Sequence, residues 1–288
     1  MDDVSELAAF TEEDIAALLN DDTFLGAGRY HAHEQPKAIL LAGQPGAGKT
    51  ELSSMMTLAL GGDAAFINGD DFRRYHPKYR KLFSLYGSDA VSLISPFSNA
   101  VVERMIDQFS DRRFHLVIEG TGRTTEVPRS TAERLSRKGY TIELAVIATR
   151  PEISLISTML RFYQMNESGT IPRATAAAAH DLVVQSLPEN LDVLSHVPEI
   201  SHITIWDREQ ELLFDSNMTF ENPSSILRGY WRRPWSEEEV QTAQEWIAVL
   251  RQKELQSHLG QNAAIDEIER RISTALQSHA PSMDFHLR

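Results

Sequence analysis

The segment from Ala38 to Leu60, AILLAGQPGAGKTELSSMMTLAL, constrains the fold more than any other part of the chain. An apolar run typical of a strand leads into glycines and a proline, and a helical pattern follows. Residues 43–50, GQPGAGKT, match the motif G-x-x-x-x-G-K-[ST] in the strand-to-helix position that the motif requires. The sequence therefore predicts a phosphate-binding loop made of Gly43, Gln44, Pro45, Gly46, Ala47, Gly48, Lys49 and Thr50.

Each residue type in this loop has a chemical reason to be there. Glycines let the backbone approach a phosphate closely, and the N–H groups beside a helix N-terminus attract the negative charge. Lys49 is predicted to contact the β- and γ-phosphates, and the Thr50 hydroxyl is predicted to bind Mg²⁺. ATP and Mg²⁺ are thus the expected ligands. Hydrolysis, signalling and phosphoryl transfer all remain open, because all three use this loop.

Strand and helix patterns alternate after the loop. Such alternation predicts βαβ units, and hence an α/β fold with a mainly parallel sheet covered by helices on both faces. Further helical sequence fills residues 151–196. Residues 211–216 fit a short strand in addition to the main strands. The remaining strands are expected at 38–42, 64–68, 114–120, 140–148 and 201–207, and helices at 96–111 and 125–139.

Helical signals also mark both ends of the chain. Thr11 is a candidate N-cap for a helix over residues 11–22. Ser236 and Glu239 fit a capping box, and two helices are expected after Ser236. We therefore predict a P-loop kinase-like domain over residues 1–235 that includes the N-terminal helix. Residues 236–288 would form a helical appendage packed on the same domain.

Composition limits the functions that need to be considered. A net charge of −13 argues against general nucleic-acid binding, which requires a basic surface. There are no cysteines, so neither a disulfide framework nor a thiolate zinc site is available. No apolar run approaches the ~20 residues that cross a bilayer, and the acidic start does not fit a secretory signal. A cytoplasmic protein without a nucleic-acid or membrane partner is expected.

Carboxylates follow two of the predicted strands, where the ends of parallel strands face a ligand crevice. Asp70 and Asp71 come after the second strand, and each fits either a proton acceptor or an N-cap about equally well. Glu119 ends the next apolar strand, with Thr121 and Arg123 close behind it. We expect Glu119 to hold Mg²⁺ through water or to bind substrate hydroxyls.

Arginines bracket a polar interruption in the helical sequence. Arg161 and Arg173 flank FYQMNESGTIP, which fits a lid whose arginines reach the transferred phosphoryl group. The alternative is a pair of ordinary surface arginines. The basic segment RRYHPKYRK at 73–81 fits either a substrate contact or a solvated face. His180 and Asp181 lie in helical sequence, where packing or capping is the simpler interpretation.

Several segments together resemble the zeta toxin family of bacterial toxin–antitoxin systems. They occur in the family's order over roughly residues 36–215, and Asp71 departs from the small hydroxyl residue that is usual after the family's base. The segments are GQPGAGKT, DDFRRYHP, SPFSNAVVE, LVIEGTGRTT, IPRAT followed by AHDLVV, and LPENLDVL.

This resemblance implies a kinase that uses ATP and Mg²⁺ to phosphorylate the sugar of UDP-N-acetylglucosamine or a related nucleotide sugar. It implies that Asp70 is the catalytic base and that Lys49, Arg161 and Arg173 contact the phosphates. It also implies a small helical antitoxin as a partner in trans. The substrate would contact Glu103, Glu119, Thr121 and Arg123, with Asn99 and His76 from the same motifs.

Two alternatives to this function stay open. One is a P-loop kinase of another small molecule, such as an antibiotic or a nucleoside. The other is a nucleotide-dependent interaction protein that transfers no phosphate. A candidate base together with lid arginines argues against the second alternative, because a protein that only binds nucleotide needs neither.

Overall fold

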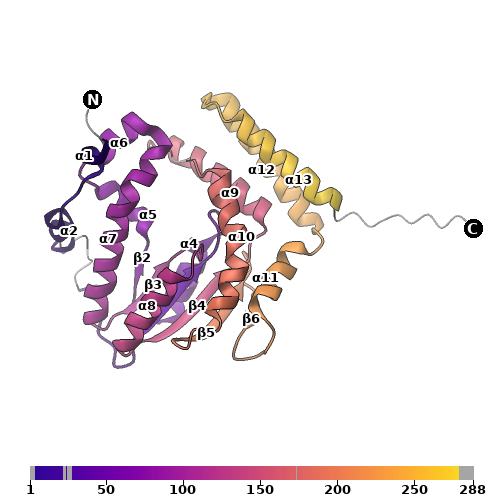
Figure 1. Cartoon of the computed structure of the whole chain (residues 1–288). Coiled ribbons are helices and arrows are strands. Elements are labelled where there is room, and N and C mark those ends of the chain that lie inside the picture. Colours follow the sequence, from indigo (N-terminus) through magenta and orange to yellow (C-terminus); the bar gives the residue numbers. More distant parts are fainter. Residues whose placement is uncertain (1–3, 22–23, 25–27, 173, 279–288) are drawn as a thin grey trace, which may run out of the picture.

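The chain folds around a six-stranded sheet (Figure 1). The structure is a computed structural model and describes residues 4–21, 24, 28–172 and 174–278. The strand order is β2-β3-β1-β4-β5-β6. All pairings are parallel except that of β6 with β5, which is antiparallel. The strands are β1 (Lys37–Ala42), β2 (Ala64–Ile67), β3 (His115–Glu119), β4 (Thr141–Ile147), β5 (Ile200–Trp206) and β6 (Leu212–Asp215).

Both faces of the sheet are apolar and covered by helices, which confirms the predicted fold class. Successive side chains of a strand point to opposite faces. On β1, Ile39 and Leu41 pack with Leu52 and Met56 of α4 (Lys49–Ala59). Ala38, Leu40 and Ala42 belong to the larger cluster on the other face. That cluster receives α7 (Ala90–Asp111), α8 (Glu126–Arg137), α10 (Ala177–Leu194) and α11 (Pro223–Arg232).

Helix α7 begins earlier than the sequence predicts. The amphipathic pattern predicted a helix over 96–111, but the helix starts at Ala90 with Pro96 inside it. Proline in a helix interior removes one backbone hydrogen bond. Ala90 and Ile94 are fully buried against α6 (Tyr79–Tyr86), and this packing favours the extra turn. The prediction also missed α1 (Val4–Ala8), α5 (Gly69–Phe72), α6 and α11.

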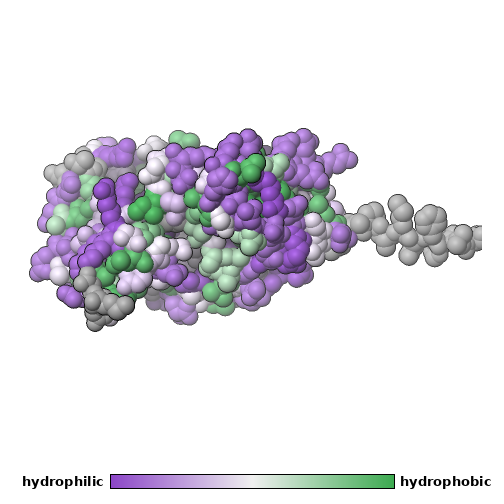
Figure 2. Space-filling view, turned by 90° about the horizontal axis from the view of Figure 1, so that it is seen from above, coloured by the Kyte–Doolittle hydropathy of each residue, from purple (hydrophilic) through white to green (hydrophobic). Residues whose placement is uncertain are grey.

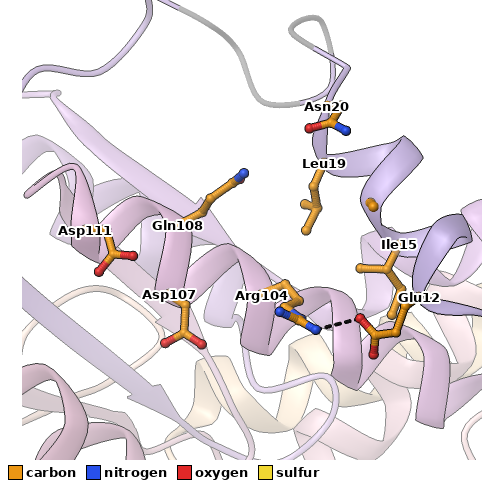
Figure 3. Close-up of a pocket in the computed structure, with 9 residues that line it drawn as sticks. Glu12, Ile15, Leu19, Asn20, Arg104, Asp107, Gln108 and Asp111 are labelled. Atoms are coloured by element: carbon orange, nitrogen blue, oxygen red, sulfur yellow. Dashed lines mark hydrogen bonds and ion pairs between the residues drawn. The ribbon is translucent and has the colours of Figure 1, made fainter.

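The N-terminal helix α2 (Glu12–Leu19) packs against α7. Thr11 caps it, as predicted, and forms a capping box with Asp14. Glu12 pairs with Arg104 of α7 at 2.5 Å (Figure 3). Ile15 and Leu19 also face α7, and a cavity of about 450 Å³ opens between the two helices. None of the predicted phosphate-loop residues lines this cavity.

Two long helices, α12 (Glu237–Ser257) and α13 (Asn262–Ser278), follow the sheet domain (Figure 1, yellow end). Ser236 caps α12 in the predicted capping box with Glu239. Both helices pack on α9 (Pro151–Glu167), which directly follows β4. Buried side chains of this contact are Ile153, Ile156, Met159, Phe162, Tyr163, Ala243, Leu250, Ile265, Ile268 and Ile272.

The face seen from above is mainly hydrophilic, with apolar side chains in separate patches (Figure 2). This agrees with the 24% of residues that are charged. Within the described part of the chain, no helix is both long enough and apolar enough to span a bilayer.

Candidate active site

The predicted phosphate loop joins the end of β1 to the start of α4, as the motif requires. Gly48 is the N-cap of α4 with φ 100°, and Gly46 has φ 76°, so both occupy left-handed conformations that favour glycine. A Cβ on Gly46 would lie 2.1 Å from the carbonyl oxygen of Ser154 on α9. The loop therefore packs directly against α9, with no room for a side chain at this position.

Lys49 lies at the centre of the loop. Its side chain is only 8% exposed, and Nζ donates to the carbonyl oxygens of Gly43 (2.9 Å) and Gln44 (3.1 Å). Burial lowers the pKa of Lys49, while the fields of Glu119 and Asp70 act in the opposite direction. A bound polyphosphate would add negative charge here and so favour the protonated amine.

Glu119 lies next to Lys49 because β3 pairs with β1. The register places Glu119 beside Leu41, two residues before the loop, and brings Oε1 to 3.9 Å from Lys49 Nζ. Burial raises the pKa of Glu119, against the lowering effect of Lys49, and Asp70 raises it further. Oε2 is buried and has no hydrogen-bond partner among the described residues. A buried carboxylate oxygen in this state suits a ligand hydroxyl or a metal-bound water.

Asp70 lies on the short helix α5, which directly follows β2. The side chain of Asn68 caps this helix by accepting from the backbone N–H of Asp70. The alternative in which Asp70 itself is the N-cap is therefore wrong. Asp70 Oδ1 instead pairs with Arg73 Nη2 at 2.6 Å, and its field acts on both Lys49 and Glu119.

The proposed lid connects α9 to α10. Arg161 is exposed on α9, and its field lowers the pKa of both Lys49 and Glu119. Arg173 lies outside the described residues. Ile171 of the same connection packs against an apolar cluster formed with α1, α6 and α7. The connection thus contacts the N-terminal part of the fold through Ile171.

Other predicted residues lie around this centre or away from it. Thr50 is exposed at the start of α4, and Thr121 and Arg123 are exposed after β3. The carbonyl oxygen of Thr121 accepts from the N–H of Gly43 at 3.3 Å, which ties the two strand ends together. These three side chains therefore border the loop and Glu119.

The other three predicted substrate residues lie on α7 and directly after residues 73–75, which follow α5. Glu103 pairs with Arg134 of α8 at 2.6 Å, and Asn99 is exposed on α7. His76 is 2% exposed; its Nε2 contacts the carbonyl oxygen of Ala8, and its Nδ1 accepts from the N–H of Lys78. Burial lowers the pKa of His76, as expected for a neutral packed ring. Neither of its nitrogens is open to a substrate.

Sequence reasoning missed two cations near the loop. Arg73 was placed in a basic cluster, but its i,i+3 spacing from Asp70 was a usable signal for the ion pair. Arg208 follows β5, donates to Ser157 Oγ at 2.9 Å and lies 3.5 Å from the carbonyl oxygen of Gly46. Its position after a parallel strand could have marked it, by the rule already applied to Glu119.

The residues fit ATP and Mg²⁺. The loop has glycines where a Cβ would clash with its neighbours, and Lys49 supplies a positive charge at its centre. Among the described residues, no group of three His, Asp or Glu side chains could hold a metal ion by itself. Mg²⁺ is usually bound by one or two protein groups together with substrate phosphates and water. Thr50 and Glu119 are suited to be those groups.

Comparison with known proteins agrees with this geometry. A sequence model of the zeta toxin family matches residues 21–219. Toxin PezT of Streptococcus pneumoniae is 37% identical over 214 residues, which are 73% of this chain and 84% of that protein. Toxin zeta of Streptococcus pyogenes is 37% identical over 246 residues, which are 85% of this chain and 86% of that protein.

A solved structure from the PezAT chromosomal toxin–antitoxin system of S. pneumoniae has the same fold. Its TM-score is 0.76 at 31% identity, and the match covers 86% of this chain and 99% of that one. The family model and the solved structure thus each match most of the chain. The chain belongs to the zeta toxin family.

Proposed function

We propose that this chain is a toxin kinase that transfers the γ-phosphoryl group of ATP to a sugar hydroxyl of UDP-N-acetylglucosamine or a related nucleotide sugar. The observation that carries the proposal is the group of Lys49, Glu119, Asp70 and Arg161 at the ends of β1, β2 and β3 and on α9. A cation on the phosphates, a carboxylate near the acceptor and a lid arginine are the parts that phosphoryl transfer needs. Family membership supports the same reaction class.

Donor binding follows from the loop. Backbone N–H groups of residues 43–50 and the N-terminus of α4 would hold the phosphates, with Lys49 on the β- and γ-phosphates. Mg²⁺, when bound by Thr50 and through water by Glu119, would offset phosphate charge. Arg161, and Arg173 from the same lid, would stabilise charge on the phosphoryl group in transfer.

Asp70 is the proposed base. Arg73 fixes the carboxylate through Oδ1, and Oδ2 is the atom that we assign as the proton acceptor. As the sugar oxygen forms its bond to the γ-phosphorus, its proton passes to Asp70 and the bond to the β,γ-bridging oxygen breaks. ADP and a sugar phosphate are the products. Glu119, Thr121 and Arg123 would position the acceptor, with Glu103 and Asn99 as further proposed contacts, whereas both ring nitrogens of His76 already have partners.

Incubation of the full chain with ATP and a panel of UDP-sugars, read by mass spectrometry, tests this function. The product should gain one phosphate, and Asp70→Asn should lower the rate by roughly 10²- to 10⁴-fold. Asp111→Asn is the matched control, because Asp111 is an exposed carboxylate at the end of α7 that pairs with Lys138. A rate for Asp70→Asn near that of wild type would show that the base is assigned wrongly.

The same assay separates the alternatives. Phosphorylation of an antibiotic or nucleoside, with no UDP-sugar product, would keep the kinase and replace the acceptor. Tight ATP binding with no transfer to any acceptor would favour a nucleotide-dependent interaction protein instead.

We also propose a partner and a domain organisation. The related S. pneumoniae structure comes from a toxin–antitoxin system, which supports a small antitoxin as a separate chain for this protein too. Growth arrest on expression in the cytoplasm, relieved by Lys49→Ala or by the antitoxin, would support this role. The division into a kinase domain at 1–235 and a helical appendage at 236–288 is likewise proposed.

A further inference from the structure

A chain of buried and half-buried side chains connects the phosphate loop to the last helix, α13. Its members are Gln44, Ser154, His180, Asp181 and Arg271, and we call it the α13 network. Arg271 lies well beyond residues 21–219, the range that the zeta toxin family model matches. The proposed mechanism uses neither His180, Asp181 nor Arg271.

At the loop, Gln44 is completely buried. Its Nε2 donates to the carbonyl oxygen of Thr149 (2.6 Å) and to Ser154 Oγ (3.2 Å). Its backbone carbonyl oxygen accepts from Lys49 Nζ. The position of the Gln44 side chain is therefore connected to the lysine that would contact the phosphates.

His180 forms the middle of the network. Its ring is 1% exposed, Nε2 lies 2.8 Å from Ser154 Oγ, and Nδ1 lies 3.4 Å from Asp181 Oδ1. Burial lowers the pKa of His180, which favours the neutral ring with a single N–H. Because Nδ1 faces a carboxylate, it carries the proton, and Nε2 accepts from the Ser154 hydroxyl. That hydroxyl also lies 2.9 Å from the carbonyl oxygen of Pro151.

Arg271 completes the network from α13. Its Nη1 and Nη2 donate to the two oxygens of Asp181 at 2.7 and 3.0 Å, a bidentate pair with defined geometry. Hydrogen bonding from Arg271 is the main reason that the pKa of Asp181 is lowered. Ile268 and Ile272 hold this part of α13 in the apolar cluster on α9. The Arg271 guanidinium therefore belongs to a helix that is held in place by its packing on α9.

We infer that Arg271 is a positioning residue for the phosphate loop, acting from α13 through Asp181, His180 and Ser154 on Gln44. This inference rests on the proposed function only for the identity of the ligand, ATP. It gives the C-terminal appendage a role in nucleotide binding. Loss of the Arg271 pair removes the constraint on Asp181 and weakens the hold on His180, and the Ser154 hydroxyl then keeps only the carbonyl oxygen of Pro151 as its acceptor.

Arg271→Gln in the full chain tests the inference, and Arg270→Gln is a matched control. Arg270 neighbours Arg271 on α13 and also pairs with Glu267, but it is exposed, and the arginine that pairs with Asp181 is Arg271. Calorimetric titration with MgATP should show a Kd about 2- to 30-fold higher for Arg271→Gln and unchanged for Arg270→Gln. Thermal melting verifies that both variants are folded.

Two further measurements separate positioning from a general structural effect. In a His180→Ala background, Arg271→Gln should have little additional effect on the MgATP Kd, because the route to the loop is already cut. Additive effects, or equal effects of the two arginine variants, would overturn the inference.

Hydrogen exchange of the nucleotide-free protein gives a readout that needs no ligand. Peptides covering residues 43–50 should exchange about 2- to 30-fold faster in Arg271→Gln than in wild type or Arg270→Gln. Unchanged exchange would overturn the inference even if the chain binds ATP. Faster exchange in a protein that binds no ATP would instead retain the network and reject the proposed function.

Discussion

Gly46→Ala is the substitution for which the phosphate loop gives the clearest quantitative expectation. Two costs arise at this position. The backbone has φ 76°, where a non-glycine residue loses roughly 1–2 kcal/mol. The new Cβ would also lie 2.1 Å from the carbonyl oxygen of Ser154, more than 1 Å short of the 3.4 Å at which ordinary contact begins. Because the neighbour is backbone, the loop has to move.

A displacement of this size removes hydrogen bonds to phosphate, since these bonds span only about 2.7–3.2 Å between donor and acceptor. Each hydrogen bond to a charged group contributes roughly 1.5–3 kcal/mol. Loss of one such bond corresponds to a MgATP Kd about 10- to 150-fold higher. Calorimetric titration of the full chain with MgATP measures this change directly.

Gly62→Ala is the matched control. Gly62 also has φ 76°, but a Cβ there meets nothing within 4 Å. It therefore carries the backbone cost without the clash, and it should lower the melting temperature while leaving the Kd unchanged. If Gly46→Ala binds MgATP within threefold of wild type, or if Gly62→Ala weakens binding equally, the steric reasoning is refuted.

Two further predictions concern stability. Burial alone would raise the pKa of Glu239, but hydrogen bonds from Arg233, the Ser236 N–H and Arg150 lower it from 4.5 to about 2. This stabilisation is present above pH ~4.5 and is lost as the pH falls toward 2, so Glu239→Gln should remove about 2–3 kcal/mol of acid-dependent stability. Urea denaturation between pH 5 and 2.5 would show it, and parallel curves for variant and wild type would contradict it. Tyr163 donates to Glu254 Oε2 at 2.8 Å, with both side chains buried. Tyr163→Phe should therefore cost about 1–3 kcal/mol in urea denaturation at pH 7, and a change below ~0.5 kcal/mol would argue against it.

Local signals in the sequence predicted several elements correctly. The apolar runs gave the strands, and Thr11 and Ser236 cap their helices as expected. The predicted α7 start was wrong, and burial of Ala90 and Ile94 decided the outcome. Propensity and caps act over a few residues, whereas burial depends on what packs from elsewhere.

The sequence by itself determined the loop GQPGAGKT, because the motif, its strand and its helix are contiguous. It also supplied the resemblance that set Asp70 above a helix cap. Only the tertiary structure decided that β3 pairs with β1, which brings Glu119 to 3.9 Å from Lys49 across 70 residues of chain. It alone placed His76 in a buried contact and joined Gln44 to Arg271. The physical reason is that strand pairing and side-chain burial depend on the packing of the whole molecule. A short segment of sequence does not specify which distant segment will pack against it.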